Sequence, residues 1–192
     1  MQITSGRLKG ASIGPVQYDG VRPTTDRMRQ AIFNAISHHI DFTQSHVEVL
    51  DLCAGTGALG LEAISRGAKR CIFVEKNALV AEAIRKTMEK CGVSKDESPI
   101  AVSDAVAFLR GISSDNYPND MPKQWDCIFC DPPYAARLLN PVTEAIIANN
   151  ALKPGGIFIA EHDRIEIIAE HTLTHLTTLA FGVTLVDIFQ SA

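Results

Sequence analysis

Residues 125–134 contain side chains suited to bind a planar base that carries an exocyclic amine. An apolar run typical of a buried parallel strand ends abruptly in the motif Asp131-Pro132-Pro133-Tyr134. Each proline fixes its own φ and disfavours a helical conformation in the residue before it, so we expect a stiff corner where the strand ends. There the Asp131 carboxylate and the Pro132 carbonyl could accept the two amine protons, while the Tyr134 ring stacks on the base. An ordinary double-proline turn would show the same residues, so the interpretation depends on the rest of the chain.

A glycine-rich segment earlier in the chain is typical of a loop that binds a nucleotide-like ligand. Gly55, Gly57 and Gly60 match the G-x-G-x-x-G pattern of dinucleotide sites, and Glu75 falls near the position of the acid that binds the ribose. However, Asp51 ends the preceding strand, four residues before Gly55, and its charge would repel a pyrophosphate. A carboxylate there suits a ligand with an ammonium and a sulfonium group instead. The pattern therefore favours S-adenosylmethionine as the ligand.

Acidic residues end four consecutive strands that we expect in this chain, namely Asp51, Glu75, Asp104 and Asp131. The carboxyl ends of parallel strands lie at one edge of an open sheet, where such folds bind ligands. Glu75 would accept both ribose hydroxyls, and Asp104 would lie near the adenine amino group. One such acid could be a solvated strand end, but four together predict a ligand pocket.

The alternation of apolar and helical segments predicts the scaffold for these residues. We expect core strands at residues 47–52, 71–75, 100–102, 127–130 and 157–160, with helices between them at 61–66, 78–91, from 105 and at 141–150. Alternating strands and helices indicate parallel βαβ units. Two closing strands, near 173–180 and 183–189, would add an antiparallel hairpin. The expected fold is α/β, a Rossmann-like doubly wound sheet of seven strands, mostly parallel, with a short N-terminal β/helix extension. Residues 135–140 are expected to be a mobile segment.

Composition and charge limit the function classes. Hydrophobic residues make up 46% and charged residues 21% of the 192 residues, as in ordinary globular proteins, and no apolar run is long enough to cross a bilayer. With no apolar leader visible, we expect a cytoplasmic protein without membrane contact. Cys127 and Cys130 form a C-x-x-C, but residues three apart in a strand face opposite sides, so we expect no metal site.

The first 30 residues carry five basic residues and two acidic ones, whereas the remainder carries thirteen basic and twenty acidic residues. A basic arm on an acidic body predicts an anionic partner that approaches at one place. Chance clustering of five residues would give the same count. Thr24 or Thr25 is a suitable N-cap for a helix that starts near Asp26 and ends before Asp41.

Three segments together resemble the RsmD family, class I S-adenosylmethionine-dependent methyltransferases that methylate N2 of one guanine in bacterial 16S ribosomal RNA. They are Arg22-Pro23-Thr24-Thr25-Asp26-Arg27 with Phe33-Asn34, Asp51-Leu52-Cys53-Ala54-Gly55-Thr56-Gly57-Ala58-Leu59-Gly60-Leu61-Glu62-Ala63, and Asp131-Pro132-Pro133-Tyr134. The first segment discriminates this family, because the other two are shared across many methyltransferases. The tail departs from the family pattern: Leu179-Ala180-Phe181 stand where basic and tyrosine residues are usual, which could weaken an RNA contact.

The resemblance implies methyl transfer from S-adenosylmethionine to a guanine N2 amine in 16S ribosomal RNA, within an assembling small subunit and by a monomer. It implies an RNA-contacting N-terminal extension over residues 1–40 and a methyltransferase domain over 41–192. The implied catalytic residues are Asp131, Pro132, Pro133 and Tyr134. The implied cofactor-binding residues are Asp51, Ala54, Gly55, Thr56, Gly57, Glu75, Lys76, Asp104 and Ala105. The implied substrate-binding residues are Arg22, Thr24, Thr25, Arg27 and Arg29, although Arg22 could equally brace its own loop.

Three other functions share parts of these motifs. Methylation of adenine N6 in DNA or RNA is the first, because Asp-Pro-Pro-Tyr can serve the amino group of either base. Methylation of a protein glutamine is the second, but that class usually has asparagine where Asp131 stands. A non-catalytic scaffold that binds the cofactor is the third, and it is disfavoured because no expected site residue is missing.

Overall fold

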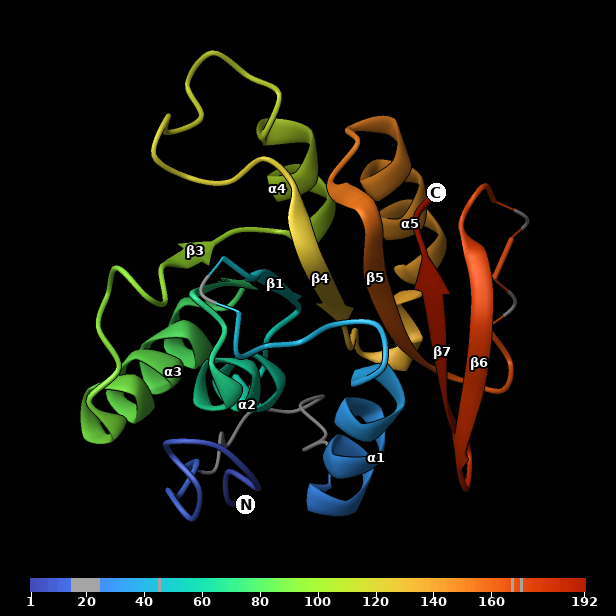
Figure 1. Ribbon diagram of the computed structural model, residues 1–192. Helices are drawn as coiled ribbons and strands as arrows, with labels where there is room; N and C mark the ends of the chain where they lie inside the picture. Colours follow the sequence, from blue (N-terminus) through green and yellow to red (C-terminus); the bar gives the residue numbers. More distant parts are fainter. Residues whose placement is uncertain (15–24, 45, 167, 170) are drawn as a thin grey trace.

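The computed structural model describes residues 1–14, 25–44, 46–166, 168–169 and 171–192 and shows a central sheet covered by helices on both faces (Figure 1). Within these residues the sheet has seven strands in the order β3-β2-β1-β4-β5-β7-β6. Their bounds are β1 Glu48–Leu52, β2 Arg70–Glu75, β3 Ile100–Val102, β4 Trp125–Cys130, β5 Leu152–Asp163, β6 Thr174–Phe181 and β7 Thr184–Gln190. Strands β1 to β5 pair in parallel, and β7 pairs antiparallel with β5 and β6. The predicted doubly wound fold with an antiparallel C-terminal hairpin is confirmed.

Helices α1 to α3 cover one face of the sheet, and α4 and α5 cover the other (Figure 1). The helices are α1 Asp26–Ile36, α2 Ala58–Arg66, α3 Ala78–Cys91, α4 Ala105–Gly111 and α5 Leu139–Ala148. Strand residues alternate between two hydrophobic clusters, so Cys127 packs on the α1–α3 side and Cys130 on the α4–α5 side. This confirms that the two thiols face opposite sides of the sheet. Among the described residues no helix is long and apolar enough to cross a membrane.

The strand register brings the predicted ligand-binding segments to one edge. Leu52 lies opposite Val74 of β2 and opposite Cys130 of β4, and all three strands run in the same direction. The residues that follow these strands are therefore neighbours, as are the glycine-rich loop, Glu75 and Asp131. The central position of β1 in the sheet explains why the loop after it can contact both neighbouring strand ends.

Residues 1–14 pack on the end of α2 and form less β structure than expected. Of the β structure expected in the N-terminal extension, residues 1–14 show one antiparallel bridge, between Gln2 and Ser12. Gly6 has a φ of 80°, and a Cβ built there would lie 1.8 Å from the carbonyl oxygen of Ser65, so only glycine fits this contact. The backbone N–H of Arg7 donates to the same carbonyl at 2.7 Å. The hydrophobic cluster continues from this segment through α1 into the sheet, and the expected boundary at residue 40 stays a prediction.

Several elements have different bounds from those expected. Helix α2 begins at Ala58, three residues early, because Gly57 takes a left-handed conformation (φ 74°) that ends the loop abruptly. Strand β5 spans 12 residues, since it continues on both sides of the apolar run at 157–160. Residues 134–136 form a short 3₁₀-helix, η1 Tyr134–Ala136, and the residues after it lead directly into α5.

Candidate active site

A cavity of about 550 Å³ lies at the carboxyl ends of β1, β2, β3 and β4. It is lined by the loop after β1, the ends of β2 and β3, and the motif after β4. Twelve of the residues that the sequence assigns to cofactor binding and catalysis line it, namely Asp51, Ala54, Gly55, Thr56, Glu75, Lys76, Asp104, Ala105, Asp131, Pro132, Pro133 and Tyr134. The structure therefore brings the two groups of predicted residues together at one cavity.

Gly57 is the predicted cofactor-binding residue that does not line the cavity. It caps the N-terminus of α2, and a Cβ built there would lie 3.1 Å from Ile84 and 3.3 Å from Phe73. The left-handed φ and the close packing both require glycine at this position. Gly57 thus shapes the loop against α3 and β2, and its neighbours contact the cavity.

The Asp51 carboxylate is buried, with 2% of the residue exposed, and Oδ2 accepts the backbone N–H of Gly60 at 2.9 Å. Burial raises the pKa of Asp51 well above its usual value, although the Gly60 hydrogen bond lowers it. Nearby Asp131 and Glu75 raise the pKa of Asp51 further, because like charges disfavour ionisation. A cationic ligand in this cavity would favour the ionised form of Asp51.

Glu75 and Asp104 organise the backbone around the cavity. Glu75 Oε2 accepts the N–H of Gly55 at 3.0 Å, and Oε1 accepts the N–H of Asn77 at 2.9 Å. A carboxylate can accept about four hydrogen bonds, so Glu75 can hold the loop and still accept ribose hydroxyls. Asp104 is the N-cap of α4, where Oδ1 accepts the N–H groups of Val106 and Ala107 at 3.0 and 3.1 Å. Both acids therefore sit in fixed orientations.

The motif after β4 lines the same cavity. Pro133 has φ −55° and ψ 125°, and Tyr134 begins η1, so the chain turns sharply after β4. The Tyr134 hydroxyl lies 2.5 Å from Thr184 Oγ1 and donates to Glu161 Oε1 at 3.4 Å. Tyr134 therefore lines the cavity, and its hydroxyl is held by β5 and β7.

Sequence reasoning missed several residues that line the cavity, including Cys53, Asn77 and Leu138. Asn77 is the N-cap of α3, and its Oδ1 accepts the N–H of Leu79 at 2.9 Å. An asparagine between an expected strand and helix is a signal that could have found it. Cys53 has φ 58°, an uncommon conformation outside glycine, and nothing in its residue type predicts this.

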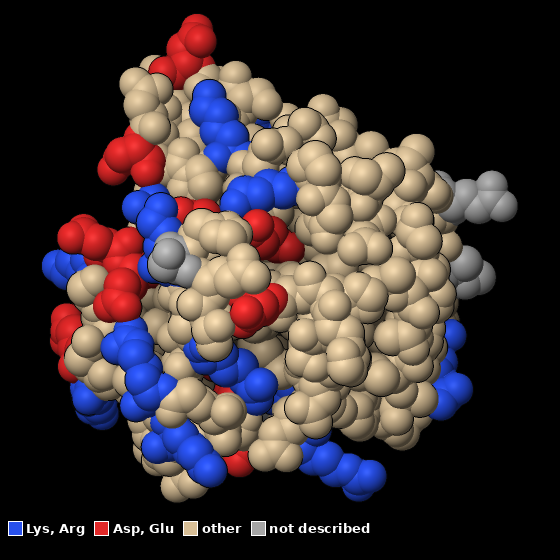
Figure 2. Space-filling view, in the orientation of Figure 1, with Lys and Arg blue, Asp and Glu red and all other residues tan. Residues whose placement is uncertain are grey.

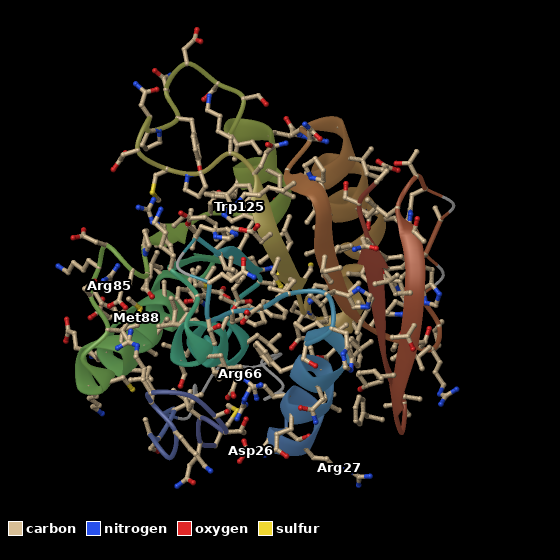
Figure 3. The ribbon with its side chains drawn as sticks, in the orientation of Figure 1. Asp26, Arg27, Arg66, Arg85, Met88 and Trp125 are labelled. Atoms are coloured by element: carbon tan, nitrogen blue, oxygen red, sulfur yellow. The ribbon has the colours of Figure 1, made fainter. Side chains whose placement is uncertain are left out.

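Only some of the predicted RNA-binding residues lie at exposed positions in the described part of the chain. Arg22 and Thr24 lie outside the described residues. Thr25 is exposed and caps α1, because its hydroxyl accepts the N–H of Met28 at 3.2 Å. Arg27 is exposed and points away from α1 into solvent (Figure 3). In the described part of the chain it takes part in no ion pair.

The prediction that Arg29 contacts RNA needs correction, because the side chain is fully buried. Its guanidinium pairs with Glu62 at 3.2 Å and with Asp26 at 2.9 Å, and it donates to the carbonyl of Gln2. Residues two apart on a helix point to nearly opposite sides, so Arg27 and Arg29 cannot both face solvent. Arg29 therefore joins α1 to α2 and to the N-terminal segment.

Charged side chains are unevenly distributed over the face shown in Figure 2. Lys and Arg gather over the lower part, where the N-terminal segment and α1 lie, whereas the surface over β7 and β6 carries few charges. Among the described residues, no group of three or more His, Cys, Asp or Glu is placed to hold a metal ion.

Comparison with known proteins gives consistent similarities over the whole length. A family model described as "Conserved hypothetical protein 95" matches residues 1–190. The chain is 31% identical to "Putative rRNA methyltransferase YlbH" of Bacillus subtilis, covering 99% of this chain and 98% of that protein. It is 29% identical to "Ribosomal RNA small subunit methyltransferase D" of Haemophilus influenzae, covering 100% and 94%. The solved structure "Putative methyltransferase yhhF from Escherichia coli" superposes with a TM-score of 0.80 at 23% identity, covering 100% of this chain and 97% of that one.

Proposed function

The chain belongs to the RsmD family of methyltransferases, and we propose that it transfers a methyl group from S-adenosylmethionine to the exocyclic N2 amine of a guanine in 16S ribosomal RNA. The observation that carries this proposal is that Asp51 and Glu75 line the same cavity as Asp131 and Tyr134. A donor held by the first pair and a base held by the second would meet inside it.

The residues present fit S-adenosylmethionine. Four carboxylates, of Asp51, Glu75, Asp104 and Asp131, line one cavity, and burial raises the pKa of Asp51. A ligand with ammonium and sulfonium charges would compensate them. The cavity volume of about 550 Å³ lies within the range of pockets that hold drug-sized ligands. When bound, S-adenosylmethionine supplies a methyl group on a positively charged sulfur. Glu75 would hold the ribose, and Asp104 and Ala105 would contact the adenine.

The motif after β4 provides the chemistry that an aromatic amine needs. Such an amine is a poor nucleophile, because its lone pair is delocalised into the ring. Hydrogen bonds to the Asp131 carboxylate and the Pro132 carbonyl would direct the lone pair toward the donor, and Tyr134 would stack on a base turned out of its helix or loop. Asp131 is then both the orienting acceptor and a candidate acceptor for the released proton.

Arg27 is the described residue that best fits a phosphate contact. It is exposed in the first turn of α1, two residues after the N-cap Thr25, and Figure 3 places it at the lower end of that helix. Such contacts fix the position of the RNA but do not read its sequence. The small size of the domain supports an assembling small subunit as the substrate, where neighbouring RNA or ribosomal proteins would help to define the target. We expect the protein to act as a monomer in the cytoplasm.

A methyl-transfer assay with radiolabelled S-adenosylmethionine tests this proposal. Naked 16S ribosomal RNA, small ribosomal subunits and double-stranded DNA are offered separately, and the labelled nucleoside is identified after digestion. We expect label on guanine N2 in ribosomal RNA or its particle. Label on adenine N6 would favour the alternative function, and the absence of label from every substrate, despite cofactor binding, would contradict RNA methylation.

A further inference from the structure

Residues 135–140 are expected from sequence to be mobile, but the structure connects residues 134–140, which follow the proline corner, to other parts of the fold by several hydrogen bonds. The register between β4 and β5 pairs Cys130 with Ala160, and β5 then continues for three more residues to Asp163. Asp163 in turn lies opposite Thr184, the first residue of β7. The end of β5 and the start of β7 therefore stand beside the segment that leaves β4.

The first contact between these parts holds the Tyr134 ring. The Tyr134 hydroxyl lies 2.5 Å from Thr184 Oγ1, and Thr184 is buried, with 7% exposed. Neither Thr184 nor Glu161, the second partner of this hydroxyl, lines the cavity. The hydroxyl end of the ring is thus fixed behind the cavity surface, which leaves the ring few orientations.

The second contact holds the backbone after η1. Arg137 has φ 49°, a left-handed conformation that non-glycine residues seldom adopt. Its Nη1 donates to Asp163 Oδ1 at 3.1 Å, and the same oxygen accepts the N–H groups of Ile165 and Glu166 at 3.0 and 2.8 Å. Asp163 therefore joins the turn after β5 to the turn after η1.

The third contact is reciprocal and fixes the start of α5. Glu166 Oε1 accepts the N–H of Leu139 at 3.2 Å, and Asn140 Oδ1 accepts the N–H of Ala169 at 2.9 Å. Together with the contacts of Tyr134 and Arg137, these make five hydrogen bonds from residues 134–140, and their partners are Glu161, Asp163, Glu166, Ala169 and Thr184.

We propose that Thr184 and Asp163 are positioning residues for the target base: they hold Tyr134 and Arg137 in the geometry that lets the Tyr134 ring stack on that base. This inference rests on the proposed function, because it names what fixes the substrate side of the same cavity. Neither residue contacts the cavity itself, so each acts through the residue that it holds.

Steady-state kinetics of Thr184→Val and Thr184→Ser test the proposal. Valine keeps the shape of the buried side chain but removes the hydroxyl, whereas serine keeps the hydroxyl. Loss of one hydrogen bond of ordinary strength predicts that Thr184→Val lowers kcat/KM for the RNA about fivefold. The dissociation constant for S-adenosylmethionine should stay within about twofold of the wild-type value, and Thr184→Ser should retain most of the activity.

A double-mutant cycle separates this role from general stabilisation. Tyr134→Phe removes the other partner of the same hydrogen bond. The kcat/KM of the double variant Tyr134→Phe/Thr184→Val should therefore be no lower than that of the less active single variant. Backbone amide exchange provides a readout that needs no substrate: the Ala136 and Arg137 N–H groups, which donate within η1, should exchange faster in Thr184→Val, and those of α2 should not.

These experiments distinguish a failure of the positioning role from a failure of the proposed function. If wild-type protein methylates none of the nucleic acids offered, the proposed function fails, and this inference fails with it. If the wild type methylates ribosomal RNA but Thr184→Val has wild-type kinetics, weakens cofactor binding in parallel, or adds its loss fully to that of Tyr134→Phe, only the positioning role is overturned.

Discussion

The two sides of the cavity are held in place by contacts of very different range. On the cofactor side, Asp104 bonds two and three positions away and Asp51 nine positions away, and the longest of these contacts joins Glu75 to Gly55, 20 positions away. On the substrate side, the partners of Tyr134 and Arg137 lie 50 and 26 positions away. Turns, helix caps and one contact between neighbouring strand ends therefore build the cofactor side, whereas the substrate side depends on the docking of the C-terminal strands. We expect changes on the two sides to separate cofactor binding from methyl transfer.

The largest expected effect is that of Asp131→Ala on the substrate side. Removing the acceptor that orients the amine should lower kcat by about 10²–10⁴-fold, the usual range for a positioned acid or base. Cofactor affinity, measured by titration calorimetry, should be nearly unchanged, because Asp51 and Glu75 remain. Retained turnover in Asp131→Ala would remove Asp131 from the mechanism, and a parallel loss of cofactor binding would show that the two sides are not separable.

Arg29→Met should cause the next largest effect, on stability. Arg29 is buried against Glu62, and removing one partner of a buried ion pair typically costs about 3 kcal/mol or more of unfolding free energy. The matched control is Arg27→Met on the exposed side of the same helix, for which we expect a change below about 0.5 kcal/mol. Urea unfolding of both variants measures this difference.

The same pair of variants tests the proposed RNA contact. Arg27→Met should weaken RNA binding and reduce the slope of log affinity against log salt concentration by about one, as expected for one lost phosphate contact. Arg29→Met should leave the slope of the folded protein unchanged. An unchanged slope in Arg27→Met would show that Arg27 is an ordinary solvated surface residue that does not contact a phosphate.

Asp51→Asn breaks the cofactor side with little change of shape. Asparagine keeps an oxygen for the N–H of Gly60 but carries no charge to attract the cationic donor. We expect affinity for S-adenosylmethionine to fall about 100-fold, within the range found when one partner of a buried charge pair is removed. At saturating cofactor, the turnover of Asp51→Asn should recover substantially, whereas that of Asp131→Ala should not. If saturating cofactor does not restore turnover in Asp51→Asn, then Asp51 also takes part in transfer.

The range of the contacts also explains which parts of the molecule could be predicted from sequence. Glycine-rich turns, strand-end acids and the proline corner are local signals, and they predict twelve of the residues that line the cavity. The burial of Arg29 could not be predicted, because Glu62 is 33 positions away and nothing in the basic segment distinguishes Arg29 from Arg27. The contacts that hold Tyr134 and Arg137 could not be predicted for the same reason, since their partners Thr184 and Asp163 are 50 and 26 positions away. Only Asn77, an N-cap between a strand and a helix, could have been found by a closer reading.

The smallest expected effect is a pH dependence of stability at His162, next to Asp163 on the substrate side. His162 Nδ1 lies 2.8 Å from the carbonyl of Asp163, and Nε2 lies 2.9 Å from Asp187 Oδ2. A carbonyl can only accept, so Nδ1 carries a hydrogen, and Nε2 can donate to Asp187 only in the protonated ring. Burial lowers the pKa of His162, but the Asp187 and Asp163 hydrogen bonds outweigh it and raise the pKa above its usual value of 6.5.

The sign of the effect follows from these shifts. Because the folded-state pKa of His162 is raised, its stabilisation is complete below pH 6.5 and is lost as the pH rises through the folded-state pKa. Burial raises the pKa of Asp187, but its hydrogen bonds with His162, Thr178 and His175 lower it overall, so its contribution is present above pH 3.8 and is lost as the pH falls through the folded-state pKa. The melting temperature should therefore decline as the pH rises above 6.5, and His162→Gln should flatten that decline. His38→Gln, at an exposed turn, is the control and should keep the wild-type slope.

Amide exchange should locate this loss of stability. As the pH rises, protection of the backbone N–H groups should fall at residues 134–140 before it falls in α2, because His162 neighbours the residue that holds Arg137. If exchange instead rises equally on both sides of the cavity, the two sides unfold as one unit, and the separation between them holds only for their chemistry.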